Sequence, residues 1–168
     1  PLLPLIFDWF TEDAQDVSLL NEAVYPNPSV ALANVLQSDN VFFDGEATRG
    51  VNVVGGEEVP VCLYAPSPFE AGSSYSHLDE AVFPSGDPNS LMTPDLGSRE
   101  AIHSPGPLVC AIFMDIGWEL GADCITLVGI EPPAPMEEPF ILAAFFQEGD
   151  RQSTVELAVE EGQHVSAE

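Results

Sequence analysis

Lysine is absent from this sequence of 168 residues, and three arginines stand against 28 aspartates and glutamates. The resulting formal net charge of −25 repels phosphate backbones and anionic lipid surfaces. We therefore expect no nucleic-acid partner. Runs of like charge are usually solvated faces, so the plainest interpretation of the acidic surface is an extracellular or salt-adapted protein.

Long apolar runs are also missing. No stretch approaches the roughly 18 apolar residues that a membrane-spanning helix needs, so we expect no membrane span. The first ten residues, PLLPLIFDWF, have no basic segment and no cleavage signature, unlike a signal peptide. Because they do not begin with methionine, we expect the chain to be cut from a longer protein. An apolar content of 45% lets a chain of this length bury a core.

Cysteine is scarce, with only Cys62, Cys110 and Cys124. No C-x-x-C pair exists, so a zinc site built on paired thiolates is not expected. The odd count allows one disulfide and one free thiol, or a partner cysteine elsewhere, and the spacing leaves the pairing open. Cys110 lies in an apolar run, where a cysteine often serves as a small buried hydrophobic residue.

Two signatures of hydrolases are absent. Without a G-x-S-x-G elbow, a serine hydrolase is not expected. There is no H-E-x-x-H motif either, and none of His77, His103 and His164 forms an i, i+4 pair with another histidine. A catalytic zinc needs three protein ligands. On residue chemistry alone, a single loop histidine beside acidic neighbours is therefore a solvated or turn-forming side chain.

Apolar periodicity and turn residues predict several short elements. The expected helices span 16–24, 30–38 and 106–118, and the expected strands span 40–45, 58–66, 140–146 and 153–161. Ser29 is a suitable N-cap for the second helix. In the third helix, Pro107 suits the first position and Gly117 suits the left-handed residue after the end.

Residues 67–106 are rich in proline, glycine, serine and aspartate, and we expect a long loop there. Loops of this length inside a compact domain are usually functional. This one contains GSSYSHLDE and then SLMTP, and the helix that follows it ends in MDIGW. In this order, the three segments resemble the C-terminal half of a metzincin zinc metallopeptidase with a leishmanolysin-like layout. The resemblance extends over roughly residues 4–120.

The resemblance implies an α+β fold. Residues 1–120 would form the lower subdomain of a metzincin-like catalytic domain, loop-rich with a few helices and short strands. Residues 121–139 would hold a strand and a proline-rich linker. Beyond the resemblance, the two strands expected at 140–146 and 153–161 are too few to form a stable sheet, so we expect residues 140–168 to be the start of a β-sandwich module whose remainder is absent.

The resemblance also implies a metal site. His77 would be the third zinc ligand, while an upstream H-E-x-x-H helix would supply the other two ligands and the general-base glutamate. This chain would then contain no catalytic residue of its own. Met92 and Pro94 would form the Met-turn beneath the imidazoles, and Asp79 or Glu80 would accept a hydrogen bond from the His77 ring.

The function implied is that of a fragment of a secreted zinc metalloendopeptidase. The intact enzyme would hydrolyse peptide bonds in a peptide or protein substrate with a zinc-bound water. This chain alone would be inactive, because it lacks the N-terminal half of the catalytic domain. Asp115 would either anchor the helix that ends in MDIGW to the Met-turn or be a plain surface carboxylate.

A non-catalytic alternative remains open. The chain would then be an acidic extracellular binding module for calcium or a protein partner, on a degenerate metzincin scaffold. Asp79, Glu80, Asp87 and Asn89 offer oxygens to a hard cation, although the regular D-x-D-x-D-G spacing is missing. Calcium is therefore the second cofactor considered, alone or beside zinc. An H-E-x-x-H motif in the coding sequence upstream of Pro1 would favour the peptidase.

Overall fold

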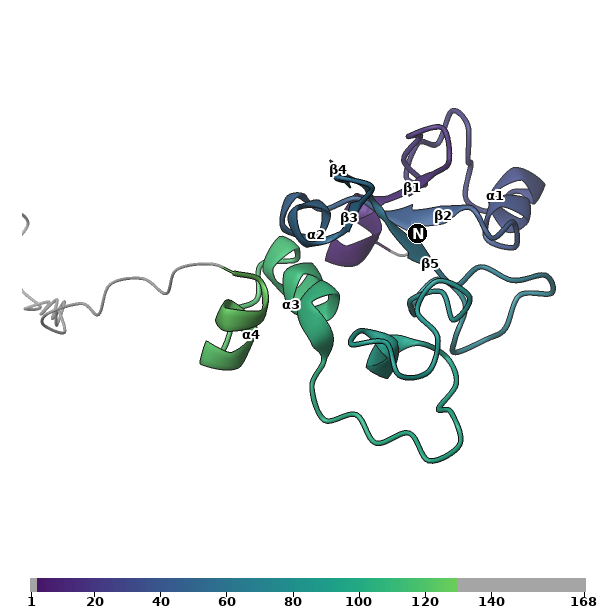
Figure 1. Cartoon of the computed structure of the whole chain (residues 1–168). Helices are drawn as coiled ribbons and strands as arrows, with labels where there is room; N and C mark the ends of the chain where they lie inside the picture. The colour runs from purple at the N-terminus through teal and green to yellow at the C-terminus, as the bar shows by residue number, and fades with distance from the viewer. Residues whose placement is uncertain (1–2, 130–168) are drawn as a thin grey trace, which may run out of the picture. The chain divides into compact units, whose positions relative to one another are not determined.

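The computed structural model describes residues 3–129 of the chain. It shows an α+β fold, as expected, with short helices, two small antiparallel sheets and long loops (Figure 1). The expected strands at 140–146 and 153–161 lie outside the described residues. None of the helices within 3–129 has the length and apolar content that crossing a bilayer requires.

The main sheet has three antiparallel strands in the order β1 (Thr11–Asp13), β2 (Val41–Phe43) and β5 (Val61–Leu63). Its register places Thr11 opposite Phe43 and Phe43 opposite Val61. A second sheet is the small hairpin of β3 (Val53–Val54) and β4 (Glu57–Glu58).

The helices are all short. They are the 3-10 helix η1 (Ile6–Phe10), α1 (Val30–Val35), α2 (Glu46–Val51), the 3-10 helix η2 (Ser90–Met92), α3 (Gly106–Asp115) and α4 (Ala122–Leu127).

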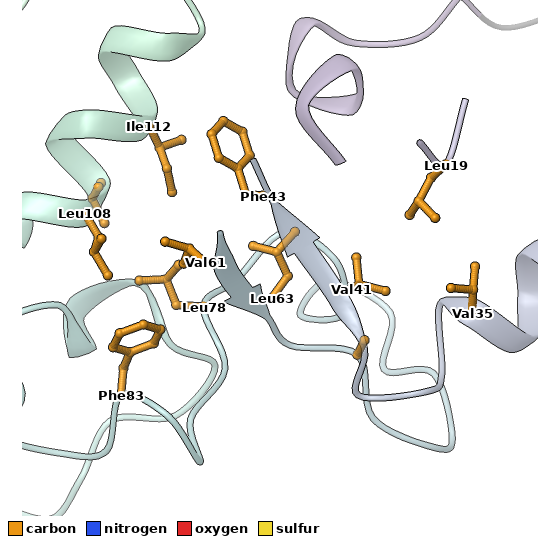
Figure 2. Close-up of a cluster of buried hydrophobic side chains, with 12 residues drawn as sticks. Leu19, Val35, Val41, Phe43, Val61, Leu63, Leu78, Phe83, Leu108 and Ile112 are labelled. Carbon is orange, nitrogen blue, oxygen red and sulfur yellow. The ribbon is translucent and has the colours of Figure 1, made fainter. Parts of the chain in front are cut away.

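One hydrophobic core joins the main sheet to α3 and to the loop that follows β5 (Figure 2). Its buried members are Leu19, Val35, Val41, Phe43, Val61, Leu63, Ala65, Leu78, Phe83, Leu108, Val109 and Ile112. Successive side chains of a strand point to opposite faces, so the first and third residues of β2 and of β5 point into the core and the middle residue points away from it. Leu78 and Phe83 belong to this core, so the loop after β5 is packed rather than loosely attached.

Several predicted elements are confirmed. The Ser29 hydroxyl accepts a hydrogen bond from Leu32 N at 3.0 Å and caps α1. Strands β2 and β5 lie inside their predicted ranges, and residues 67–105 hold only η2 as regular structure before α3 begins at Gly106. Pro107 lies in the first turn of α3, and Gly117 has a φ of +85° just after the helix.

The predicted helix at 16–24 is wrong, and turns occupy that region. The Asp13 carboxylate accepts hydrogen bonds from Gln15 N and Val17 N and holds the chain in a turn. Asp16 then adopts a φ of +60°, outside the helical region. Aspartate competes with helix formation in this way because its short side chain bonds nearby main-chain groups.

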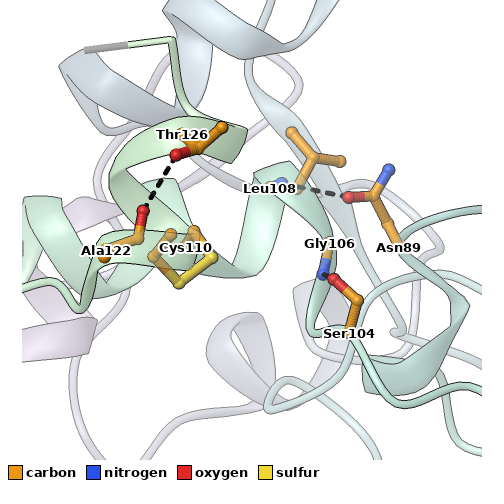
Figure 3. Close-up of a disulfide and its surroundings, with 8 residues drawn as sticks. Asn89, Ser104, Gly106, Leu108, Cys110, Ala122 and Thr126 are labelled. Carbon is orange, nitrogen blue, oxygen red and sulfur yellow. Dashed lines mark hydrogen bonds between the residues drawn. A yellow bond between two sulfur atoms is a disulfide. The ribbon is translucent and has the colours of Figure 1, made fainter. Parts of the chain in front are cut away.

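In the range 121–139, for which a strand and a linker were predicted, residues 122–127 form α4, and residues 130–139 lie outside the described residues. A disulfide between Cys110 and Cys124 ties α4 to α3 (Figure 3). Cys62 keeps a free thiol. The structure thus settles the pairing that the cysteine spacing left open.

Asp115 anchors α3 to α2, not to the predicted Met-turn. Its carboxylate accepts hydrogen bonds from Ala47 N and Thr48 N, both at 2.9 Å, and from the Thr48 hydroxyl at 2.5 Å. These groups include the free N–H groups at the start of α2, which no helical carbonyl can satisfy. Gly45 makes the approach possible, because a Cβ there would lie 2.0 Å from an Asp115 carboxylate oxygen.

Replacing both Cys110 and Cys124 with serine is expected to lower the free energy of unfolding by about 3 kcal/mol, the usual effect of a cross-link that closes a loop of this size. Chemical denaturation with and without reductant measures it. Reductant should destabilise the wild-type chain and leave the double variant unchanged. Equal stability of the oxidised and reduced wild-type chain would contradict the prediction.

Asp115→Ala is expected to cost about 2 kcal/mol of unfolding free energy, because it removes a helix cap and leaves the buried Thr48 hydroxyl without its partner. Glu119→Ala is the matched control, since it removes an exposed carboxylate four residues later and should change stability by less than about 0.5 kcal/mol. Similar losses for the two variants in urea denaturation would show that Asp115 does not cap α2.

Candidate functional site

The segment around His77 lies against the outer edge of β5. Leu78 forms an antiparallel bridge with Leu63. Tyr64 N donates to His77 O at 2.9 Å, and Asp79 N donates to Cys62 O at 3.2 Å. The main chain of His77 is therefore held by the sheet, although no regular strand is formed there.

The His77 ring is oriented by the turn that precedes it. Its Nδ1 lies 2.9 Å from the carbonyl oxygen of Ser73 and 3.2 Å from the hydroxyl of Ser76. A carbonyl oxygen only accepts, so Nδ1 carries a proton, and in the neutral ring Nε2 then keeps its lone pair. A main-chain carbonyl bonded to one ring nitrogen is a common way to fix a histidine that binds metal through the other.

Asp79 and Glu80 lie beside His77, where we expected one of them to accept from the ring. The acceptor at Nδ1 is instead the Ser73 carbonyl. The Asp79 carboxylate accepts from Ala81 N at 2.7 Å and from the Cys62 thiol at 3.6 Å. Glu80 has one carboxylate oxygen, Oε2, that is buried without a hydrogen-bond partner among the described residues.

Cys62 does not provide a thiolate at neutral pH. Burial raises the pKa of its thiol to about 12, and the negative charge of Asp79 and the hydrogen bond to it act in the same direction. A protonated thiol is a poor metal ligand and a poor nucleophile. The half-buried free cysteine is therefore neither a metal ligand nor a nucleophile at neutral pH.

Met92 meets the His77 segment through its main chain. Leu78 N donates to Met92 O at 2.9 Å, and the Met92 side chain is partly buried against the hydrophobic core. Thr93 is extended, with φ −88° and ψ 161°, as the residue before a proline favours, and Pro94 follows it. The predicted Met-turn and the predicted third ligand thus come from adjacent segments of the structure.

The loop just before Met92 is secured to α3. The Asn89 side-chain oxygen accepts from Leu108 N at 3.0 Å, near the start of the helix (Figure 3). Gly106 allows the close approach, because a Cβ there would lie 2.4 Å from Pro88 O. The Asp87 carboxylate accepts from Asn89 N and from the Asn89 amide. These oxygens, considered above for calcium, are bonded to protein donors.

Glu100 closes the same loop. Its carboxylate accepts from the Ser90 hydroxyl at 2.7 Å and from Gly97 N at 2.6 Å. The Ser90 bond, with help from the main-chain donors, lowers the pKa of Glu100 to about 2. The carboxylate is therefore ionised at every physiological pH and acts as a fixed clasp for residues 86–100.

No group of three or more histidine, cysteine, aspartate and glutamate side chains within 3–129 is arranged to hold a metal ion. The described residues thus offer His77 as a single ligand and do not by themselves complete a zinc or calcium site. This agrees with the absence of H-E-x-x-H from the sequence. A zinc site that used His77 would take its other ligands from outside these residues.

A cluster of carboxylates that the sequence did not indicate surrounds Glu12 in β1. Glu12 is only 9% exposed, and its Oε1 is buried without a partner among the described residues. Burial raises the pKa of Glu12, and the nearby carboxylates of Asp44, Asp16 and Asp13 raise it further, while Arg49 lowers it. Arg49 forms an ion pair with Asp44. In a strand, alternate side chains point to opposite faces, so burial of Thr11 and Asp13 does not predict burial of Glu12 between them. All three residues of β1 are nevertheless buried.

Comparison of the chain with protein-family models, with curated proteins and with solved structures returns no match. The resemblance to metzincins therefore depends on the segments around His77, Met92 and Asp115 alone.

Glu12→Gln is expected to stabilise the protein at pH 7 to 8. A raised pKa means that the folded state binds the proton more tightly than the unfolded state, so wild-type stability falls as pH rises through the raised pKa. The advantage of the variant should vanish below about pH 4.5, where the carboxyl is protonated in both states. Urea denaturation across this pH range measures it.

Glu22→Gln is the control for the acidic cluster, because it removes an exposed carboxylate from a neighbouring turn. It should show no comparable pH dependence. A Glu12→Gln variant that is less stable than wild type at pH 8 would mean that the Glu12 charge is compensated by groups we have not identified.

Proposed function

We propose that this chain is part of a secreted zinc metalloendopeptidase, in which His77 is one of the zinc ligands. The observation that carries the proposal is the His77 ring itself, whose Nδ1 is bonded to Ser73 O and whose Nε2 is left with its lone pair. This is the state in which an imidazole binds a metal. A solvated loop histidine has no need of a fixed tautomer.

The surroundings of His77 support the same role. The bond from Leu78 N to Met92 O joins the histidine segment to the Met-turn segment across fourteen positions of sequence. The bridge between Leu63 and Leu78 holds both against the core. A ligand held by a packed sheet loses little freedom when it binds, which favours a preorganised metal site.

The division of labour in the intact enzyme follows from what these residues provide. His77 would hold one coordination position, while the remaining ligands and the general base come from outside 3–129. Bound zinc supplies Lewis-acid activation of water for peptide hydrolysis. Met92 contributes an apolar floor at the ligand segment, and the Asn89 and Glu100 clasps keep the turn in place.

The coding sequence upstream of Pro1 is the first thing to read. An in-frame H-E-x-x-H motif supplies the two missing histidines and the general base, as the proposal requires. A start codon or signal peptide without that motif would refute the peptidase. The binding module on a degenerate metzincin scaffold would then be the better explanation.

In the complete protein, His77→Gln is expected to lower peptidase activity by more than about 100-fold, because removing a ligand exceeds the 10- to 100-fold effect of losing an outer partner. Metal analysis should find less than one zinc per chain in the variant. His103→Gln is the matched control and should retain both zinc and activity. Full zinc content in His77→Gln would overturn the assignment of His77.

A further inference from the structure

Tyr75 joins the turn before His77 to distant parts of the chain. Its phenolic oxygen donates to an Asp8 carboxylate oxygen at 2.7 Å and lies 2.9 Å from the Thr11 hydroxyl. These partners belong to η1 and the start of β1, 67 and 64 positions away in the sequence. The Tyr75 ring also meets Phe7 edge to face, with 5.8 Å between ring centroids.

The main chain of Tyr75 is constrained as well. Its N–H donates to Tyr64 O at 2.7 Å, and its φ is +74°. A bulky residue rarely adopts this left-handed conformation, and it persists only where surrounding contacts compensate for it. Two residues later, Tyr64 N donates to His77 O. Tyr64 therefore binds the main chain at both Tyr75 and His77.

Ser73, whose carbonyl oxygen bonds the His77 ring, comes two residues before Tyr75 in the sequence, and His77 comes two residues after it. Ser73 N and Ser74 N both donate to Glu70 O, and Glu70 N donates to the Ser74 hydroxyl. These three hydrogen bonds lie within residues 70–74 and do not tie the turn to the rest of the chain. Within the chain between Ser73 and His77, Tyr75 supplies the side-chain bonds to η1 and β1.

We propose that Tyr75 is a positioning residue for His77: by pinning the turn to Asp8 and Thr11, it keeps the Ser73 carbonyl at His77 Nδ1 and leaves Nε2 free to bind a metal. The part that concerns the metal rests on the proposed function. The part that concerns the tautomer stands on the contacts of the described chain alone. Asp8, Thr11 and Tyr75 touch no metal in this scheme and act only through His77.

The test is the His77 tautomer in the full chain at pH 8. Long-range ¹⁵N–¹H NMR of the two ring nitrogens reports it, with His77→Gln used for assignment and His103 as an internal reference. Wild type should show the proton on Nδ1. Tyr75→Phe should lower the ratio of the Nδ1–H to the Nε2–H form by about fivefold, the factor that corresponds to one hydrogen bond of ordinary net strength.

Tyr25→Phe is the matched control, because it also removes a phenolic hydroxyl bonded to a carboxylate, that of Asp13. It should cost similar stability and leave the His77 tautomer unchanged. Thr11→Val, which removes the other partner of the Tyr75 hydroxyl, is the second variant should Tyr75→Phe fold poorly. It should shift the tautomer in the same direction. Asp8→Asn keeps an oxygen acceptor and should preserve the wild-type ratio.

An unchanged tautomer in folded Tyr75→Phe or Thr11→Val would overturn the proposal, as would an equal shift in Tyr25→Phe. This outcome is separate from the test of function. A tautomer shift in a protein whose His77 binds no zinc would retain Tyr75 as a positioning residue and refute the peptidase. If His77 binds zinc and Tyr75→Phe has no effect on the tautomer, the proposed function stands and the role of Tyr75 as a positioning residue is refuted.

Discussion

The main-chain pairing between β5 and residues 77–79 is the interaction on which the rest of the candidate site depends. It inserts Leu78 into the core next to Leu63, and this burial fixes the position of the His77 main chain. The same pairing presents Leu78 N to Met92 O. Without it, the turn at His77 and the predicted Met-turn would be two independent loops. With it, packing of the core and placement of the candidate ligand become the same event.

The long loop gains its order from side chains that replace regular structure. Asn89 caps α3, Glu100 gathers main-chain donors, and Asp79 closes the turn that follows it. Each carboxylate or amide satisfies main-chain N–H groups that a helix or sheet would otherwise satisfy. This explains why a segment so rich in aspartate and serine folds into a fixed shape. Part of the acidic character of the sequence serves as internal caps, and the remainder covers the surface.

Local chemistry made some of the structure predictable. Ser29, Pro107 and Gly117 act within a few residues of where they stand. Ser29 and Gly117 were placed correctly, and Pro107 lies one position later in its helix than predicted. Other features depend on contacts far along the chain. The start of α2 is capped by Asp115, which lies 68 positions beyond Ala47 in the sequence. No local sequence pattern indicates a contact over this separation. The turn at 16–24 escaped prediction because Asp13 competes for the main chain. The acceptor for the His77 ring is a main-chain carbonyl oxygen, which every residue carries, so the sequence could not indicate it.

The candidate ligand, by contrast, could be identified from its sequence neighbours, while the network through Tyr75 required the fold. The central claim is that His77 binds zinc through Nε2 in the complete protein. Anomalous diffraction at the zinc absorption edge, on crystals of that protein, tests it most directly. The account predicts a zinc peak about 2.0–2.1 Å from His77 Nε2, with Nδ1 still bonded to Ser73 O. A zinc peak elsewhere, or an Nε2 that faces only water, would contradict it.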